Sequence, residues 1–226
     1  MKEGIKVSPE KAAEIERLTR GQSRCQRWFD EKKWRITASK FGDVCKSGPD
    51  RDLDILASNI YDPPNLSGYP AVRHGLMYEA TALERFTSQT GKNIKGCGLF
   101  ILPEFPFLGA SPDGLVEGED AIVEVKCPYA AKDKKILPGK HIPYLEYSGD
   151  KIQLKKNHSH HYQIQGQLML SGRKKCYFIV YTMCDLLIEE IPFDRSFFEE
   201  KMQSQLENFY EKVYCPYVAA EIIKPK

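Results

Sequence analysis

Residues 109–128 read GASPDGLVEGEDAIVEVKCP, and this stretch decides the fold. Its second half is rich in valine and isoleucine, which favours a buried strand, and its EGED run is typical of a turn between two strands. If the turn centres on Gly118 and Glu119, the residue numbers of opposed positions in an antiparallel hairpin add up to 237. The sequence therefore predicts a hairpin in which Asp113 lies opposite Glu124.

Three charged side chains then gather on one face of this hairpin. Lys126 follows Glu124 by two positions and shares its face, whereas Val123 and Val125 face the core, because side chains alternate along a strand. A hard cation such as Mg²⁺ takes one or two protein carboxylates and keeps its other positions for water and substrate phosphate. The pattern is therefore typical of a metal-dependent phosphoryl site. An ordinary cross-strand ion pair has the same pattern, and the hairpin alone leaves both interpretations open.

Outside the hairpin, the chain alternates between helical and strand-like patterns and carries no internal repeat, which predicts one domain over residues 1–226. Ser8-Pro9-Glu10 is typical of a helix start, with a capping serine and a proline in the first turn. The segments predicted to be helical are 9–20, 23–33, 38–45, 72–90, 160–170 and 196–214. The segments predicted to be strands are 93–102, 108–116, 121–127, 175–182 and 186–191.

The helix predicted over 72–90 contains one unusual carboxylate. Its apolar stripe on an ideal helical wheel consists of Val72, Leu76, Ala80, Leu83 and Phe86. Glu79 falls inside this stripe, and a carboxylate on an apolar face is costly unless something pairs with it. Glu79 therefore either has a structural partner, such as an arginine, or belongs to a functional site.

Two further segments are expected to lie at the surface. Residues 130–158 contain prolines, glycines and many lysines, which predicts a long, partly mobile loop. The tail that follows the last predicted helix contains prolines and is expected to be loosely held.

Composition excludes several classes of protein. The chain has 226 residues and no apolar stretch near the roughly 18 residues of a membrane span, so we expect a soluble intracellular protein of the cytoplasm or nucleus. Its 7 cysteines form no C-x-x-C pair, which argues against a zinc ribbon or an iron–sulfur cluster. His158, His160 and His161 lack a neighbouring cysteine, so a structural or DNA-contacting role is favoured over zinc binding.

Charge is distributed unevenly along the chain. Residues 126–175 carry 11 Lys and Arg against 3 Asp and Glu, and residues 185–212 carry 3 against 8. A basic face could attract a polyanion, although two solvated faces of opposite sign would give the same counts.

The motifs together resemble a known family. Ser111-Pro112-Asp113-Gly114-Leu115 followed by Glu124-Val125-Lys126-Cys127-Pro128 resembles the core of the phage lambda exonuclease family, the YqaJ-type viral recombinase nucleases, within the PD-(D/E)xK superfamily. Arg35-Ile36-Thr37-Ala38-Ser39 is similar to the family's R-I-T-A-S motif, and Tyr162-Gln163-Ile164-Gln165 is similar to its Q-x-Q helix. His74-Gly75 and Tyr78-Glu79 resemble its G…E helix. The resemblance spans roughly residues 22–180.

The resemblance implies an α/β fold with a restriction-endonuclease-like core, in which a small mixed β-sheet is flanked by helices. It divides the domain into a helical N-terminal part (about 1–60), a nuclease core (about 70–195) and a C-terminal helix and tail (about 196–226).

The resemblance also implies roles for individual residues. The catalytic set would be Asp113, Glu124, Lys126, Glu79 and Gln163. The metal ligands would be Asp113, Glu124, the backbone carbonyl of Val125, and Glu79 at a second metal position. The residues for the 5′-terminal phosphate would be Lys32, Arg35, Thr37 and Ser39. Relatives usually carry an arginine four residues after the tryptophan of W-x-x-x-R, where this chain has Lys32 after Trp28.

The activity implied by the resemblance is a Mg²⁺-dependent exonuclease, with one or two ions and Mn²⁺ as a substitute. It would digest linear double-stranded DNA in the 5′→3′ direction and leave 3′ single strands for recombination or repair. A single-strand annealing protein and further copies of the chain in a ring-shaped trimer would be its partners. Two alternatives remain open at this point: an endonuclease on the same core, and a non-catalytic module that binds DNA or recruits a partner.

Overall fold

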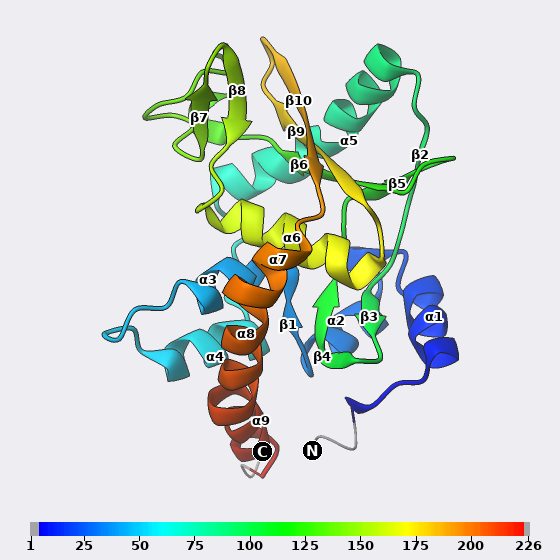
Figure 1. Cartoon of the computed structure of the whole chain (residues 1–226), viewed down its shortest axis with the longest axis vertical. Helices are drawn as coiled ribbons and strands as arrows, with labels where there is room; N and C mark the ends of the chain where they lie inside the picture. The colour runs from blue at the N-terminus through cyan, green and yellow to red at the C-terminus, as the bar shows by residue number, and fades with distance from the viewer. Residues whose placement is uncertain (1–4, 224–226) are drawn as a thin grey trace.

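A five-stranded mixed sheet carries the hairpin in the computed structural model, which describes residues 5–223 (Figure 1). The strand order is β10-β9-β6-β5-β2, in which β6 and β9 are parallel and the other pairs are antiparallel. The strands are β2 (Ile94–Lys95), β5 (Gly114–Val116), β6 (Ala121–Lys126), β9 (Lys175–Tyr181) and β10 (Leu186–Pro192).

Two smaller sheets complete the strand inventory of the described residues. The first has the order β1-β4-β3, and the second is the hairpin β7-β8. Their strands are β1 (Ile36–Thr37), β3 (Phe100–Leu102), β4 (Phe105–Ala110), β7 (Leu145–Ser148) and β8 (Lys151–Leu154). Helix α6 (Ser159–Ser171) crosses the middle of the molecule and contacts β3, β4 and β9, so it links the two larger sheets (Figure 1).

The remaining helices surround these sheets. The α-helices are α1 (Pro9–Leu18), α2 (Gln26–Lys32), α3 (Phe41–Cys45), α4 (Leu53–Tyr61), α5 (Pro70–Thr90), α7 (Arg195–Phe198), α8 (Ser204–Phe209) and α9 (Cys215–Ile223). Short 3₁₀ turns are η2 (Gln22–Arg24), η3 (Ala38–Lys40) and η4 (Tyr129–Ala131), and π-helical turns are η5 (Glu199–Gln203) and η6 (Tyr210–Tyr214). This mixed α/β architecture, with small mixed sheets flanked by helices, confirms the predicted fold class.

The two faces of the central sheet pack against different helices. Val123 and Val125 lie in one buried cluster with Ala82 and Phe86 of α5. On the opposite face, the buried cluster contains Ile122 together with two residues of α6, Ile164 and Leu168. The alternation predicted from the sequence is therefore confirmed, and Glu124 and Lys126 face α6.

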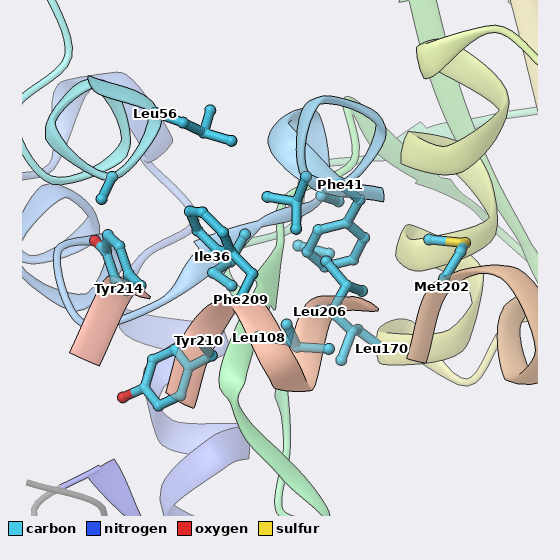
Figure 2. Packing of buried hydrophobic residues seen from close by; sticks show 14 of the residues in the cluster. Ile36, Phe41, Leu56, Leu108, Leu170, Met202, Leu206, Phe209, Tyr210 and Tyr214 are labelled. Carbon is cyan, nitrogen blue, oxygen red and sulfur yellow. The ribbon is translucent and has the colours of Figure 1, made fainter. Parts of the chain in front are cut away.

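A third core joins the two ends of the chain. Figure 2 shows Ile36 and Phe41, from the N-terminal part, packed around Leu206, Phe209 and Tyr214 of the C-terminal helices. This packing is why the C-terminal region is ordered. The chain is helical as far as Ile223, so the expected end of the last helix near residue 214 is wrong, and residues 215–223 are not a loosely held tail. Residues 224–226 of the predicted tail lie outside the described residues.

The sequence also misplaced several boundaries. Each of the predicted strands 93–102 and 108–116 divides into two strands that belong to different sheets. Pro112 interrupts the second one, because proline has no N–H to give to a strand ladder. Helix α4 was not predicted. The predicted loop 130–158 contains the β7-β8 hairpin, which was not predicted, and buries Ile142 and Leu145.

Helix α5 is present as predicted and ends at Gly91, whose φ of 71° suits a glycine. Its buried face overlaps the predicted stripe only in part. Phe86 is buried as predicted, but Leu76 is 65% exposed and His74 is buried instead. The buried face is rotated away from Leu76, because ring contacts from Tyr78 and Phe86 reach β9. Within residues 5–223, no helix combines the length and apolar character needed to span a bilayer.

Candidate active site

The register of the β5-β6 hairpin is the one predicted. Gly114 pairs with Val123 and Leu115 with Ile122, so each pair of residue numbers adds up to 237. Asp113 lies one residue before β5, and its backbone N–H donates to the Val123 carbonyl over 3.0 Å. Its Oδ2 accepts a hydrogen bond of 2.6 Å from the Val125 N–H. These two bonds fix Asp113 beside the strand that carries Glu124 and Lys126.

Glu124 is the centre of a hydrogen-bonded network and is 2% exposed. Its Oε1 accepts from Lys126 Nζ at 2.5 Å and from Gln163 Nε2 at 2.7 Å. Its Oε2 accepts from Gln167 Nε2 at 2.7 Å. Both carboxylate oxygens are therefore oriented by α6 and β6, which is how a buried charge avoids the cost of lost hydration.

The electrostatic environment shifts the pKa values of Asp113 and Lys126. Burial, and then the charge of Glu124, raise the pKa of Asp113 well above its ordinary value. Burial opposes the charge on Lys126, but Glu124 and Asp113 outweigh it and hold the pKa of Lys126 above its ordinary value. Lys126 is therefore an ammonium at neutral pH, while Asp113 and Glu124 form a pair of like charges that favours a nearby cation.

Glu79 belongs to the same electrostatic environment. It lies half-buried on α5, and burial followed by the charge of Glu124 raises its pKa, while Lys126 lowers it. Of the two readings left open by the sequence, proximity to this site fits better than an arginine partner, because no ion pair joins Glu79 to an arginine among residues 5–223.

The donor set fits a hard divalent cation. Asp113 and Glu124 supply two carboxylates. The N–H and C=O of one strand residue point to the same side, so the Val125 carbonyl faces the side on which Asp113 lies. In the described part of the chain, no group of three or more His, Cys, Asp and Glu side chains is arranged to hold a metal. Two carboxylates and a carbonyl suit Mg²⁺ or Mn²⁺, which retain water, and do not suit structural zinc.

A small cavity of about 60 Å³ lies between the N-terminal region and the two glutamines that hold Glu124. Lys32 Nζ lies 3.6 Å from the centroid of the Trp28 ring, and Trp28 Nε1 donates to Ser111 Oγ at 2.8 Å. Burial, and then the charge of Lys40, lower the pKa of Lys32 to about 8. The residues around the cavity are Trp28, Lys32, Thr37, Ala38, Ser39, Ser111, Gln163 and Gln167. One cation and several hydroxyl groups make this cavity suitable for an anion.

Arg35 requires a correction. It is 3% exposed, its Nε donates to the Pro106 carbonyl at 3.0 Å, and its Nη1 donates to Glu31 Oε2 at 2.8 Å. The guanidinium therefore ties α2 to β4 and does not line the cavity with Lys32, Thr37 and Ser39. A buried ion pair of this kind gives the R-I-T-A-S arginine a structural role.

Ser111 and Gln167 were not among the predicted site residues, although Gln167 shares the polar face of its helix with Gln163. Gln167 follows Gln163 by four residues, a spacing that places both on one face of a helix, and this was the available signal. Gly166 lets that helix approach closely, because a Cβ atom there would lie 2.2 Å from the Phe41 ring. The His158 side chain accepts a hydrogen bond from the His160 N–H and so caps the N-terminus of α6. This contact gives His158 a structural role.

The family model of the YqaJ-like viral recombinase domain matches residues 27–174. No curated sequence matches significantly.

Several solved structures share the fold. The alkaline exonuclease of Laribacter hongkongensis superposes with a TM-score of 0.64 at 22% identity, covering 87% of this chain and 96% of that one. A phage-related exonuclease from Haemophilus somnus 129PT has a TM-score of 0.55 at 12% identity, covering 83% and 95%. The shutoff and exonuclease protein of Kaposi's sarcoma-associated herpesvirus has a TM-score of 0.60 at 13% identity, covering 93% and 73%.

Proposed function

We propose, from the premise that this chain belongs to the family of YqaJ-like viral recombinase domains, that it is a divalent-metal-dependent exonuclease of linear double-stranded DNA. The observation that carries the proposal is the network around Glu124. A buried carboxylate held by Lys126, Gln163 and Gln167, with Asp113 beside it, is costly for stability alone and suited to phosphoryl chemistry. The exonucleases with the same fold add support for the class of reaction.

Asp113, Glu124 and the Val125 carbonyl would hold Mg²⁺, or Mn²⁺ in its place, and Glu79 would serve a second ion or its waters. The ion, when bound, supplies Lewis-acid stabilisation of the charge that develops on the phosphate. The raised pKa of Asp113 fits this assignment, since a cation relieves the repulsion between Asp113 and Glu124.

Lys126 and Gln163 act on the reacting groups themselves. The Lys126 ammonium balances the negative charge that accumulates on the phosphate, because its raised pKa keeps it protonated. Gln163, which contacts both Glu124 and Lys126, orients the attacking water. The water oxygen forms a bond to phosphorus and the water releases a proton to solvent, while the bond to the 3′ oxygen breaks and that oxygen takes a proton from solvent. The released product keeps its 5′-phosphate.

The position of the anion cavity predicts the direction of digestion. Lys32, Thr37, Ser39 and Ser111 would receive the terminal 5′-phosphate, so that the next phosphodiester along the strand lies at Glu124. Digestion then runs 5′→3′ and leaves a 3′ single strand. A duplex labelled at one 5′ end tests this polarity, because the label should be released first as a mononucleotide.

We also propose two kinds of partner for this chain: an annealing protein and further copies of the chain itself. A 3′ single strand is the substrate of a single-strand annealing protein, and a ring of three copies around the duplex would make digestion processive. Size-exclusion chromatography with light scattering, with and without duplex DNA, tests the second point.

The reaction class is tested by incubating linear duplex with Mg²⁺ or with EDTA, for the wild type, Lys126→Ala and Asp113→Asn. We expect cleavage only with Mg²⁺, and at least about 10²-fold less with either variant. Binding of DNA without cleavage under all conditions would instead leave a non-catalytic module.

A further inference from the structure

Gln167 lies between the catalytic carboxylate and the anion cavity, and the proposed chemistry does not yet use it. It is 1% exposed and comes from α6, four residues after Gln163. Its Nε2 donates to Glu124 Oε2 at 2.7 Å. Its Oε1 is buried and has no hydrogen-bond partner within residues 5–223. One end of this amide is therefore fixed and the other is unsatisfied.

Gln167 is also part of the wall of the anion cavity. Gln163 and Gln167 both line it, and each of them holds one oxygen of Glu124. An occupant of the cavity therefore touches the two amides that orient the catalytic carboxylate. A buried carbonyl oxygen without a donor is costly, so a contact that brings a donor to Gln167 Oε1 would be favourable.

An anion in the cavity can draw the Lys32 ammonium, a hydrogen-bond donor, towards Gln167 Oε1. Its ammonium has three N–H donors and lies over the Trp28 ring, and it forms no ion pair in the described range 5–223. A terminal phosphate offers Lys32 a full negative charge inside the cavity. One N–H can then bind the phosphate while another donates to Gln167 Oε1.

We propose that Gln167 is a positioning residue that makes cleavage depend on the group at the 5′ end of the DNA. When a terminal phosphate fills the cavity, Lys32 bridges the phosphate and Gln167 Oε1, and the Gln167 amide holds Glu124 in its metal-binding orientation. This inference rests on the proposed exonuclease function. Its consequence is that a 5′-phosphate raises kcat and does not merely lower KM, because the effect is exerted through Glu124.

The test compares two substrates that differ only at one end. Each is a duplex with one end closed by a hairpin loop, and the open end carries either a 5′-phosphate or a 5′-hydroxyl. We expect wild-type protein with Mg²⁺ to show a higher kcat on the phosphorylated end. Gln167→Met preserves the length of the side chain and removes both hydrogen-bonding atoms, so it should reduce the kcat ratio of the two substrates by about fivefold.

Gln165→Met is the matched control. Gln165 is 0% exposed on the same helix, but its Nε2 donates to the Pro192 carbonyl at 3.0 Å and its Oε1 accepts from the Asp194 N–H at 2.8 Å. It lies outside the cavity, so the kcat ratio should stay at the wild-type value. If Gln167→Met does not fold, Gln167→Asn replaces it. Its amide is too short to reach both Glu124 and the cavity, so the same loss is expected.

A double variant tests whether Lys32 and Gln167 act together. In a Lys32→Ala background, Gln167→Met should cause no further fall in the ratio, because the two residues act in one chain of contacts. A variant that slows both substrates equally would assign Gln167 a structural role and overturn the inference. A wild-type kcat ratio of one would overturn it as well, while leaving the exonuclease intact. Failure of the wild type to cut either substrate would refute the proposed function itself.

Discussion

Val125 donates its backbone N–H to Asp113 Oδ2 over 2.6 Å, just beyond the last paired residues of the β5-β6 hairpin. The carboxylate takes the place that a strand carbonyl would occupy in a longer hairpin. Its orientation is therefore set by the backbone of the same strand that carries Glu124 and Lys126. The sheet positions the two carboxylates, and α6 supplies the amides that hold one of them.

Asp113→Asn should separate activity from stability. Asparagine keeps an oxygen that can accept from the Val125 N–H, but it removes the charge that faces Glu124. We expect metal-dependent cleavage to fall by at least about 10²-fold. The melting temperature of the metal-free protein should rise or stay unchanged, because a like-charge repulsion is lost. A variant with wild-type cleavage would contradict the assignment of Asp113.

The same substitution has a pH signature. The pKa of Asp113 is raised in the folded protein, so the folded state binds its proton more tightly than the unfolded state does. Its contribution to stability is therefore complete below the ordinary aspartate range and is lost as the pH rises through the folded-state pKa. In metal-free protein, the melting temperature of the wild type minus that of Asp113→Asn should decrease as the pH rises. A constant difference would count against the raised pKa.

Recognition of a terminal phosphate should depend on pH through Lys32. Burial and Lys40 lower the pKa of Lys32 to about 8, so the free protein loses this charge as the pH rises through that value. The KM for 5′-phosphorylated duplex should increase between pH 7 and pH 9. Lys32→Arg should remove this dependence, because a guanidinium stays protonated throughout the range. An identical pH profile for both proteins would argue against Lys32 as the phosphate ligand.

Arg35→Ala should affect stability and leave recognition of the DNA end unchanged. The substitution removes the buried partner of the Glu31 carboxylate and the hydrogen bond to the Pro106 carbonyl. The free energy of unfolding, measured with denaturant, should therefore decrease by about 3–5 kcal/mol. Arg27 also pairs with Glu31, at 3.7 Å, but is far more exposed, so Arg27→Ala should cost less than about 1 kcal/mol. A selective loss of cleavage on phosphorylated ends with Arg35→Ala would restore the phosphate role inferred from the sequence.

Gly166→Ala tests the packing that holds the two glutamines. The added Cβ would lie 2.2 Å from the Phe41 ring, and α6 would have to move away from α3. We expect a loss of about 1–3 kcal/mol of stability together with slower cleavage. Gly75 is also helical but has open space around it, so Gly75→Ala should leave stability unchanged or raise it by about 1 kcal/mol. Equal effects of the two substitutions would rule out close packing as the reason for Gly166.

Local patterns predicted the hairpin well and the surroundings less well. The turn EGED and the alternation of Val123, Glu124 and Val125 were enough to obtain the register, because a strand has a fixed period of two. The buried face of α5 was predicted only in part, since Phe86 is buried as expected whereas Leu76 is exposed. Burial depends on which side of the helix meets the sheet, and a helical wheel contains no such information.

The role of Arg35 shows where a motif is insufficient. Its position beside Thr37 and Ser39 in the sequence agrees with a phosphate ligand, but Arg35 lies just before β1 and its side chain is held by Glu31 and Pro106. Thr37, in contrast, lines the cavity. Gln167 was missed for a related reason, since only the tertiary position of α6 brings it against Glu124.

The central claim is that the Glu124 network cuts DNA from an end. Its most direct test is to incubate a 5′-phosphorylated linear duplex and a covalently closed circle of the same sequence with the protein and Mg²⁺, with EDTA and Lys126→Ala as controls. We predict loss of the linear duplex alone, dependent on both Mg²⁺ and Lys126. Cutting of the circle would contradict the claim and indicate an endonuclease on the same core.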